Sequence, residues 1–100
     1  MINLVVALKA EAAPLVRHLN LQRLDVGGCV TAYESNAYRL VVGGVGKCAS
    51  AFACGWLGAG SSAGDIWINV GIAGHRSADP GSFFVAHSVT DVAAGRSWYP

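Results

Sequence analysis

The chain has 100 residues, a length that fits one small domain. Charged residues make up only 13% of it and hydrophobic residues 53%, so we expect part of its surface to be covered by further chain or by a partner subunit, because charged residues are usually about 25%. A formal net charge of +1, without any run of basic residues, excludes the electrostatic footprint of a nucleic-acid-binding or membrane-surface protein.

The first segment is predicted to be a strand followed by a helix. Residues 2–8 form a short apolar run typical of a buried strand. From Glu11 onward, apolar residues recur at helical spacing. Pro14 is expected in the first turn of this helix, where its missing N–H has no intrahelical partner. Strand, short turn and helix are the opening of an α/β unit.

The next segment is predicted to be a three-stranded meander over residues 21–26, 29–35 and 38–42. Gly27-Gly28 separates the first two strands and is a strong signal for a hairpin. A second tight connection joins the last two strands. The meander leads into a glycine-rich turn.

A helix is predicted to begin near Lys47, directly after the turn that contains Gly44 and Gly46. These residues fit a loose dinucleotide-binding fingerprint, in which glycines let a phosphate approach helix N–H groups. A preceding meander is the wrong context for that fingerprint, and Cys48 stands where a P-loop requires Ser or Thr. We therefore favour a structural strand-to-helix turn, and keep Gly44, Gly46 and Lys47 as possible support for a site.

Another buried strand is predicted over residues 66–70, and the turn Gly71-Ile72-Ala73-Gly74-His75 follows it. In open α/β sheets, ligands bind outside the carboxyl ends of the strands. If this strand is parallel to the first, Glu11 and the turn from Gly71 to Gly74 face the same crevice. An acid early in a helix is also favourable for the helix dipole, so the joint placement is the reason to suspect a site. His75, beside the turn, is a candidate for contact with a ligand.

The last predicted elements are a strand over residues 82–91 and a loop over residues 94–100. No linker or internal repeat divides the chain, so residues 1–100 are predicted to form a single unit. The histidines lack metal-ligand spacing, and no metal or cofactor is expected. The cysteines, three in number and without framework spacing, predict reduced thiols in a cytoplasmic protein.

Two features bear on a membrane partner, and neither predicts one. The apolar opening run reaches an acid at Glu11 and lacks the basic start of a signal peptide. The uncharged stretch over residues 48–64 is interrupted by glycines and serines and falls short of about 20 strongly apolar residues.

Taken in order, these motifs resemble a known family. A strand ends in Ala7-Leu8-Lys9-Ala10-Glu11, Gly44-Val45-Gly46-Lys47 opens a helix, and a later strand runs into its turn as Ile68-Asn69-Val70-Gly71-Ile72-Ala73-Gly74. A proline-glycine turn and a strand ending in Ser88-Val89-Thr90-Asp91 follow. This order is similar to the N-terminal half of the nucleoside phosphorylase/nucleosidase family. It is nearest to the branch of methylthioadenosine/S-adenosylhomocysteine nucleosidase and hopanoid-associated nucleosidase-like proteins.

The resemblance implies a three-layer α/β/α fold around a mixed, barrel-like sheet, and a homo-oligomer. It implies hydrolysis of the N-glycosidic bond of a purine nucleoside of the adenosine type. The acid matching Glu11 serves the water that attacks C1′ of ribose, which is general-base work. The turn matching Ile72-Ala73-Gly74 lines the pocket for base and ribose. The ribose-binding residues and the acid that protonates the purine are expected beyond Pro100, so the 100-residue chain alone is expected to be inactive.

Three alternatives stay open. The first is a phosphorylase, in which phosphate replaces water, although Glu11 would repel that anion. The second is a non-catalytic remnant of the fold that binds nucleosides, because Ile72 stands where the family commonly has Ser or Thr. The third is a small α/β domain whose glycine turns are purely structural.

Overall fold

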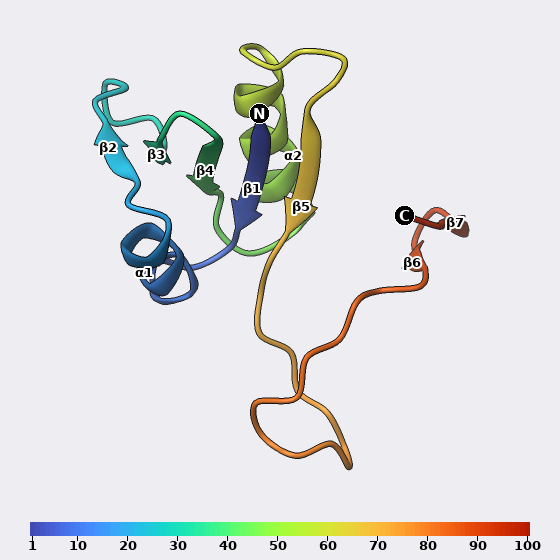
Figure 1. The fold of residues 1–100 in the computed structure, drawn as a ribbon. Helices are drawn as coiled ribbons and strands as arrows, with labels where there is room; N and C mark the ends of the chain where they lie inside the picture. The colour runs from blue at the N-terminus through green and yellow to red at the C-terminus, as the bar shows by residue number, and fades with distance from the viewer.

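The computed structural model describes residues 1–100, and its centre is a mixed sheet of five strands in the order β2-β3-β4-β1-β5 (Figure 1). β1 (Ile2–Val6) is parallel to β4 (Tyr38–Val42) on one side and to β5 (Ile66–Asn69) on the other. β2 (Gln22–Leu24) and β3 (Thr31–Glu34) extend the sheet from β4 as an antiparallel meander. The expected barrel-like sheet is wrong, because a barrel needs its outermost strands to pair, whereas β2 and β5 lie at opposite edges.

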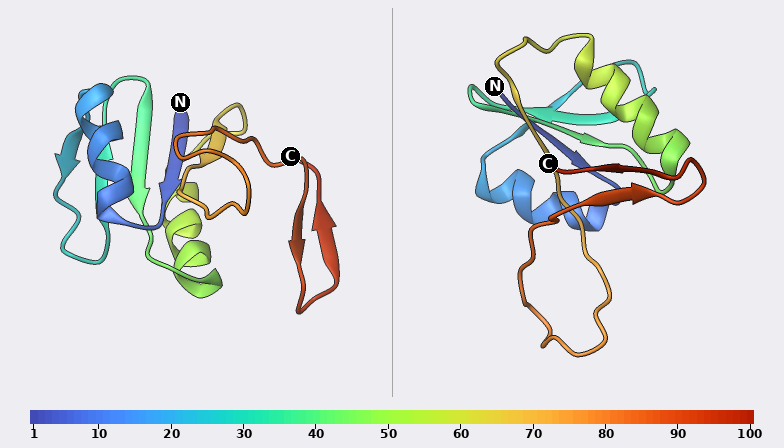
Figure 2. Two further views of the ribbon diagram at one scale, coloured as in Figure 1. Left: turned by 90° about the horizontal axis from the view of Figure 1, so that it is seen from below. Right: turned by 90° about the vertical axis from the view of Figure 1, so that its right-hand side faces the viewer.

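The two helices cover opposite faces of this sheet (Figure 2). Alternation along β1 directs Leu4 and Val6 into the cluster that contains Ala12 of α1 (Lys9–His18). Val5 points the other way, into the cluster of Ala53 and Leu57 on α2 (Lys47–Gly58). The central strand is therefore buried on both sides, as its continuous apolar run predicts.

The start of α1 corrects the predicted place of Pro14. The Glu11 carboxylate accepts the Leu8 N–H at 3.0 Å and caps the start of the helix, which already begins at Lys9. Pro14 consequently lies in the second turn, inside the helix. There its ring removes the N–H that would bond to the carbonyl of Ala10.

The first connection of the meander also differs from the predicted two-residue hairpin. Gly27 and Gly28 have φ angles of 70° and 81°, a conformation that favours glycine. The register pairs Leu24 with Ala32, which centres the connection on Gly28 rather than between the two glycines. The two strands are shorter than predicted for this reason.

The prediction that β5 is buried is wrong. All four of its residues are exposed, with Ile66 at 57%, Trp67 at 42% and Ile68 at 43%. The physical reason is its place: β5 pairs only with β1, so its other edge has no neighbour. An apolar run indicates that a segment is suited to burial, but it does not reveal whether a neighbour is present.

After β5 the chain leaves the sheet as an extended arm, defined here as residues 70–100 (Figure 1). The predicted strand over residues 82–91 is wrong in extent, because only β6 (Val89–Asp91) is regular. The predicted terminal loop contains β7 (Arg96–Trp98), which pairs antiparallel with β6. Asp91 accepts the N–H of Ala93 at 3.0 Å, a local turn signal that closes this hairpin and that the prediction overlooked.

Candidate functional site

Glu11 joins the two segments that the sequence predicts to meet. One oxygen of its carboxylate, Oε2, accepts the Leu8 N–H at 3.0 Å, and the other, Oε1, accepts the Ile72 N–H at 3.0 Å. The predicted juxtaposition is confirmed, because β1 and β5 are parallel and their carboxyl ends lie side by side. The connection spans 61 residues of sequence.

Gly71 lies directly against the Glu11 carboxylate. A Cβ atom at Gly71 would stand 3.4 Å from Oε1 of Glu11 and 3.9 Å from the carboxyl carbon, which is ordinary van der Waals contact. The turn therefore packs on Glu11 at contact distance.

The electrostatics of Glu11 follow from its partners. The hydrogen bond from the Ile72 backbone, and after it the one from Leu8, lowers the pKa of the Glu11 carboxyl below its ordinary value of 4.5, while desolvation partly opposes them. The group is therefore ionised at neutral pH. Each carboxylate oxygen offers more than one acceptor site, so a water can also bind to Glu11.

A cleft of about 570 Å³ lies at the carboxyl ends of β1 and β5 and the first turns of α2. The three residues predicted to support a site, Gly44, Gly46 and Lys47, all line it. Sequence reasoning missed Ser50 and Asn69, which also line it. The available signals were that Ser50 follows Lys47 by nearly one helical turn and that Asn69 is a polar residue at the end of an apolar strand.

Neither Glu11 nor the turn from Gly71 to His75 lines the cleft itself. Ala7 connects the two groups: it lines the cleft, and its carbonyl accepts the Gly44 N–H at 3.0 Å. The following residue, Leu8, is the one bound by Glu11. Glu11 and the start of the turn therefore form one set of predicted residues, and Gly44, Gly46 and Lys47 form a second set at the cleft. The end of β1 lies between the two sets.

Lys47 is not a free cation at this cleft. Its Nζ lies 3.1 Å and 3.3 Å from the two carboxylate oxygens of Asp91, in the hairpin of the arm. An anionic ligand in the cleft would compete with Asp91 for this ammonium group. The Lys47 side chain is 73% exposed, so water screens the pair strongly.

The other predicted residues lie in the arm, away from the cleft. His75 stacks on Phe84 with ring centroids 5.1 Å apart, and its Nδ1 accepts the N–H groups of Ser77 and Ala78. Ile72 is 82% exposed, and Ala73 and Gly74 are exposed as well. The turn contacts Glu11 only through its first two residues, and the predicted contact of His75 with a ligand stays a prediction.

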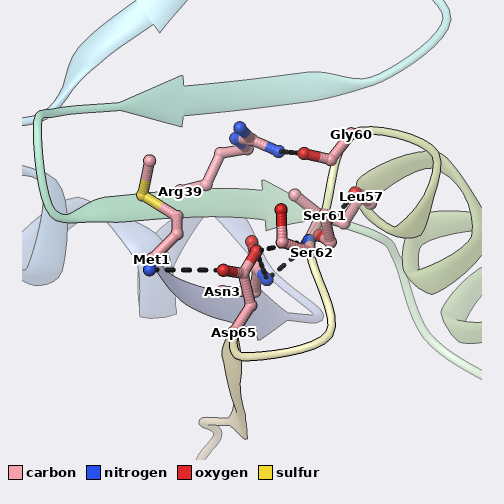
Figure 3. Close-up of polar contacts among 8 residues, drawn as sticks. All are labelled: Met1, Asn3, Arg39, Leu57, Gly60, Ser61, Ser62 and Asp65. Carbon is pink, nitrogen blue, oxygen red and sulfur yellow. Dashed lines mark hydrogen bonds and ion pairs between the residues drawn. The ribbon is translucent and has the colours of Figure 1, made fainter.

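A second polar cluster lies at the opposite end of β1 (Figure 3). Asn3 is fully buried, and its Nδ2 donates to Ser61 Oγ at 3.1 Å and to Asp65 Oδ2 at 3.4 Å, whereas its Oδ1 has no partner. Asp65 also lies 3.3 Å from the amino group of Met1. These contacts tie the connection between α2 and β5 to the central strand, which is a structural role that sequence reasoning missed.

Comparison with protein families, curated proteins and solved structures found no match to this chain. No group of three or more His, Cys, Asp or Glu side chains is arranged to hold a metal ion. Neither helix has the length and apolar character needed to cross a membrane.

Proposed function

We propose that the protein is a nucleosidase that hydrolyses the N-glycosidic bond of a purine nucleoside of the adenosine type. The observation that supports this most strongly is the 3.0 Å hydrogen bond between Glu11 and the Ile72 N–H. The bond joins an ionised carboxylate to the glycine turn at the carboxyl ends of parallel strands. The resemblance to nucleosidases expects Glu11 and the turn to meet, although neither of them lines the cleft.

The architecture supports the same proposal in outline. A mixed sheet with α1 on one face and α2 on the other is compatible with the three-layer α/β/α fold of the nucleoside phosphorylase type. We place the protein in the cytoplasm as a homo-oligomer, with a nucleoside as its small-molecule partner and without a cofactor. Three unpaired cysteines, two of them exposed, fit a reducing compartment.

In the proposed reaction, a water bound to Glu11 attacks C1′ of the ribose. The carboxylate accepts the proton of the water as the new C1′–O bond forms, and the electron pair of the broken C1′–N bond leaves with the base. The lowered pKa of Glu11 keeps the carboxylate ionised at neutral pH, but it also makes Glu11 a weaker base than a carboxylate whose pKa is raised toward neutrality. By the resemblance, the acid that protonates the departing purine lies beyond residue 100.

Phosphorolysis is the second candidate, and the lining of the cleft favours it. Lys47, Ser50 and the N-terminal end of α2 offer an ammonium, a hydroxyl and a helix dipole to an anion. Glu11 does not line the cleft, so its charge opposes a phosphate there less than its position in the sequence suggests. Phosphate would have to displace Asp91 from Lys47.

The experiment is adenine release from a panel of 5′-substituted adenosines, with and without phosphate, by the protein as encoded by its full gene. Release without phosphate, with the 5-substituted ribose as the second product, supports the nucleosidase. A strict requirement for phosphate, with the 5-substituted ribose 1-phosphate as the product, transfers the function to a phosphorylase. Binding of these nucleosides without release under either condition refutes both enzymes and identifies a binding module. If the nucleosides do not bind either, the glycine turns are structural.

A further inference from the structure

The imidazole ring of His75 is held in one orientation within the loop that follows β5. Its Nδ1 accepts the N–H of Ser77 at 3.1 Å and the N–H of Ala78 at 2.8 Å. One face of the ring stacks on Phe84, with the centroids 5.1 Å apart and the planes 7° from parallel. Figures 1 and 2 show this part of the chain as a loop that turns back on itself beyond the end of β5.

These contacts also decide which ring nitrogen carries the proton. A nitrogen that accepts two N–H groups has no proton of its own, so the proton of the neutral imidazole is on Nε2. The hydrogen bonds of the ring are made through Nδ1, and His75 is exposed. The outer edge of the ring therefore offers one N–H donor in a defined direction.

The local structure of the loop does not require this donor. An asparagine side chain accepts backbone N–H groups a few residues further along the chain in an Asx-turn, so it would make the two bonds that Nδ1 makes. What histidine adds at this position is the Nε2–H and the flat ring that stacks on Phe84. Both are suited to a planar ligand with an acceptor atom.

The loop holds this donor close to Glu11. Three residues before His75, the Ile72 N–H is bound to the Glu11 carboxylate at 3.0 Å. Consecutive Cα atoms are about 3.8 Å apart across a trans peptide, and the chain has no cis bond, so the Cα atoms of Ile72 and His75 are at most about 11 Å apart. In the proposed reaction C1′ of ribose lies at the water bound to Glu11, and the purine extends outward from C1′ toward this range.

We infer that His75 recognises the base, by donating a hydrogen bond from Nε2–H to a ring nitrogen of the purine while Phe84 supports the imidazole. This role rests on the proposed function, because the bond between Glu11 and Ile72 is what relates the loop to C1′. A purine suits the donor because its ring nitrogens are acceptors that lie in the plane of a flat ring. The hydrogen bond forms with the intact substrate, so it contributes to binding rather than to the chemical step.

The test compares the wild type with His75→Asn, in the protein as encoded by its full gene. This variant keeps the two backbone hydrogen bonds of the loop and removes the Nε2–H. We expect kcat/KM for adenine release to fall about three- to tenfold, mainly through KM, because one hydrogen bond to the substrate is lost. His18→Asn is the matched control: His18 is an exposed histidine on α1, and its variant should match the wild type.

The inhibition constants of 1-deaza-, 3-deaza- and 7-deazaadenosine separate recognition of the base from a structural effect. For the wild type, we expect the analogue without the accepting nitrogen to bind about three- to tenfold more weakly than the other two. In His75→Asn this difference should disappear, because donor and acceptor are both absent. If His75 only shapes the loop, the variant weakens all three analogues equally, and that result overturns its proposed role.

The proposed role of His75 and the proposed function fail in different ways. Release of adenine with equal kcat and KM in the wild type and His75→Asn overturns the role of His75 and leaves the nucleosidase standing. If neither protein releases adenine, the nucleosidase fails, and titration with adenosine then decides the role of His75. A dissociation constant about three- to tenfold weaker in His75→Asn supports it, whereas equal constants or no binding overturn it.

Discussion

Gly43 fixes how closely α2 approaches the sheet, and replacing it should destabilise the protein by a predictable amount. A Cβ atom at Gly43 would stand 2.7 Å from Cβ of Ala53, a residue that is fully buried. This is about 1 Å inside an ordinary contact, and neither the strand end nor the helix can move without disturbing the core. We expect Gly43→Ala to cost about 1–3 kcal/mol of unfolding free energy, the range for overpacked cores.

The assay is urea unfolding followed by circular dichroism, with thermal unfolding beside it. For a domain of this size, 1 kcal/mol corresponds to about 4–8 °C in Tm. Ala53→Gly removes the clashing methyl group, so in that background Gly43→Ala should cost at least about 1 kcal/mol less. A Gly43→Ala protein as stable as the wild type, or a cost that Ala53→Gly leaves unchanged, would refute the proposed contact.

Three further predictions concern stability. Leu57→Ala should cost about 3 kcal/mol because Leu57 is fully buried, whereas Phe52→Ala, at an exposed position of the same helix, should stay within about 0.5 kcal/mol in urea unfolding. Gly46→Ala should destabilise by about 1–3 kcal/mol because its φ is +101°, whereas Gly55→Ala, in open space within α2, should gain about 0.5–1 kcal/mol. Glu11 has a depressed pKa, so its ionised carboxylate stabilises the folded protein above its ordinary pKa of 4.5, and this stabilisation is lost as the pH falls through the lower folded value. The Tm difference between wild type and Glu11→Gln should therefore shrink over that pH range. A difference that stays constant with pH would contradict this prediction.

The elements with a strong local pattern were predictable from sequence. The apolar run of β1, the helix after Gly46 and the strand over residues 38–42 each appear where the pattern indicates. Their signals are local: periodicity, glycine turns and length. The boundaries of α1 were less predictable, because they depend on the carboxylate of Glu11 acting as a cap.

What could not be predicted depends on neighbours. β5 has the composition of a buried strand, but its burial requires a strand on its outer edge, and the sequence does not reveal one. Residues 82–88 have strand-forming side chains and no ladder to join. Their apolar character predicts a strand only if a partner is supplied.

The candidate site was predictable in part for the same reason. Parallel strands bring their carboxyl ends together, so the meeting of Glu11 with Ile72 followed from topology. Topology did not predict that this pair lies outside the cleft. That depends on the direction in which the backbone groups of the turn point. The ion pair of Lys47 with Asp91 spans 44 residues and has no local signal.

The most direct test of the proposed function uses the protein as encoded by its full gene and compares adenine release by the wild type, Glu11→Gln and Glu34→Gln under the same conditions. The amide that Glu11→Gln introduces can still accept the Ile72 N–H but cannot take a proton from water. We expect release to fall about 10²–10⁴-fold in Glu11→Gln. Glu34 lies on β3, outside the candidate site, and Glu34→Gln should stay within about twofold of the wild type. Equal release by Glu11→Gln and the wild type would contradict the account.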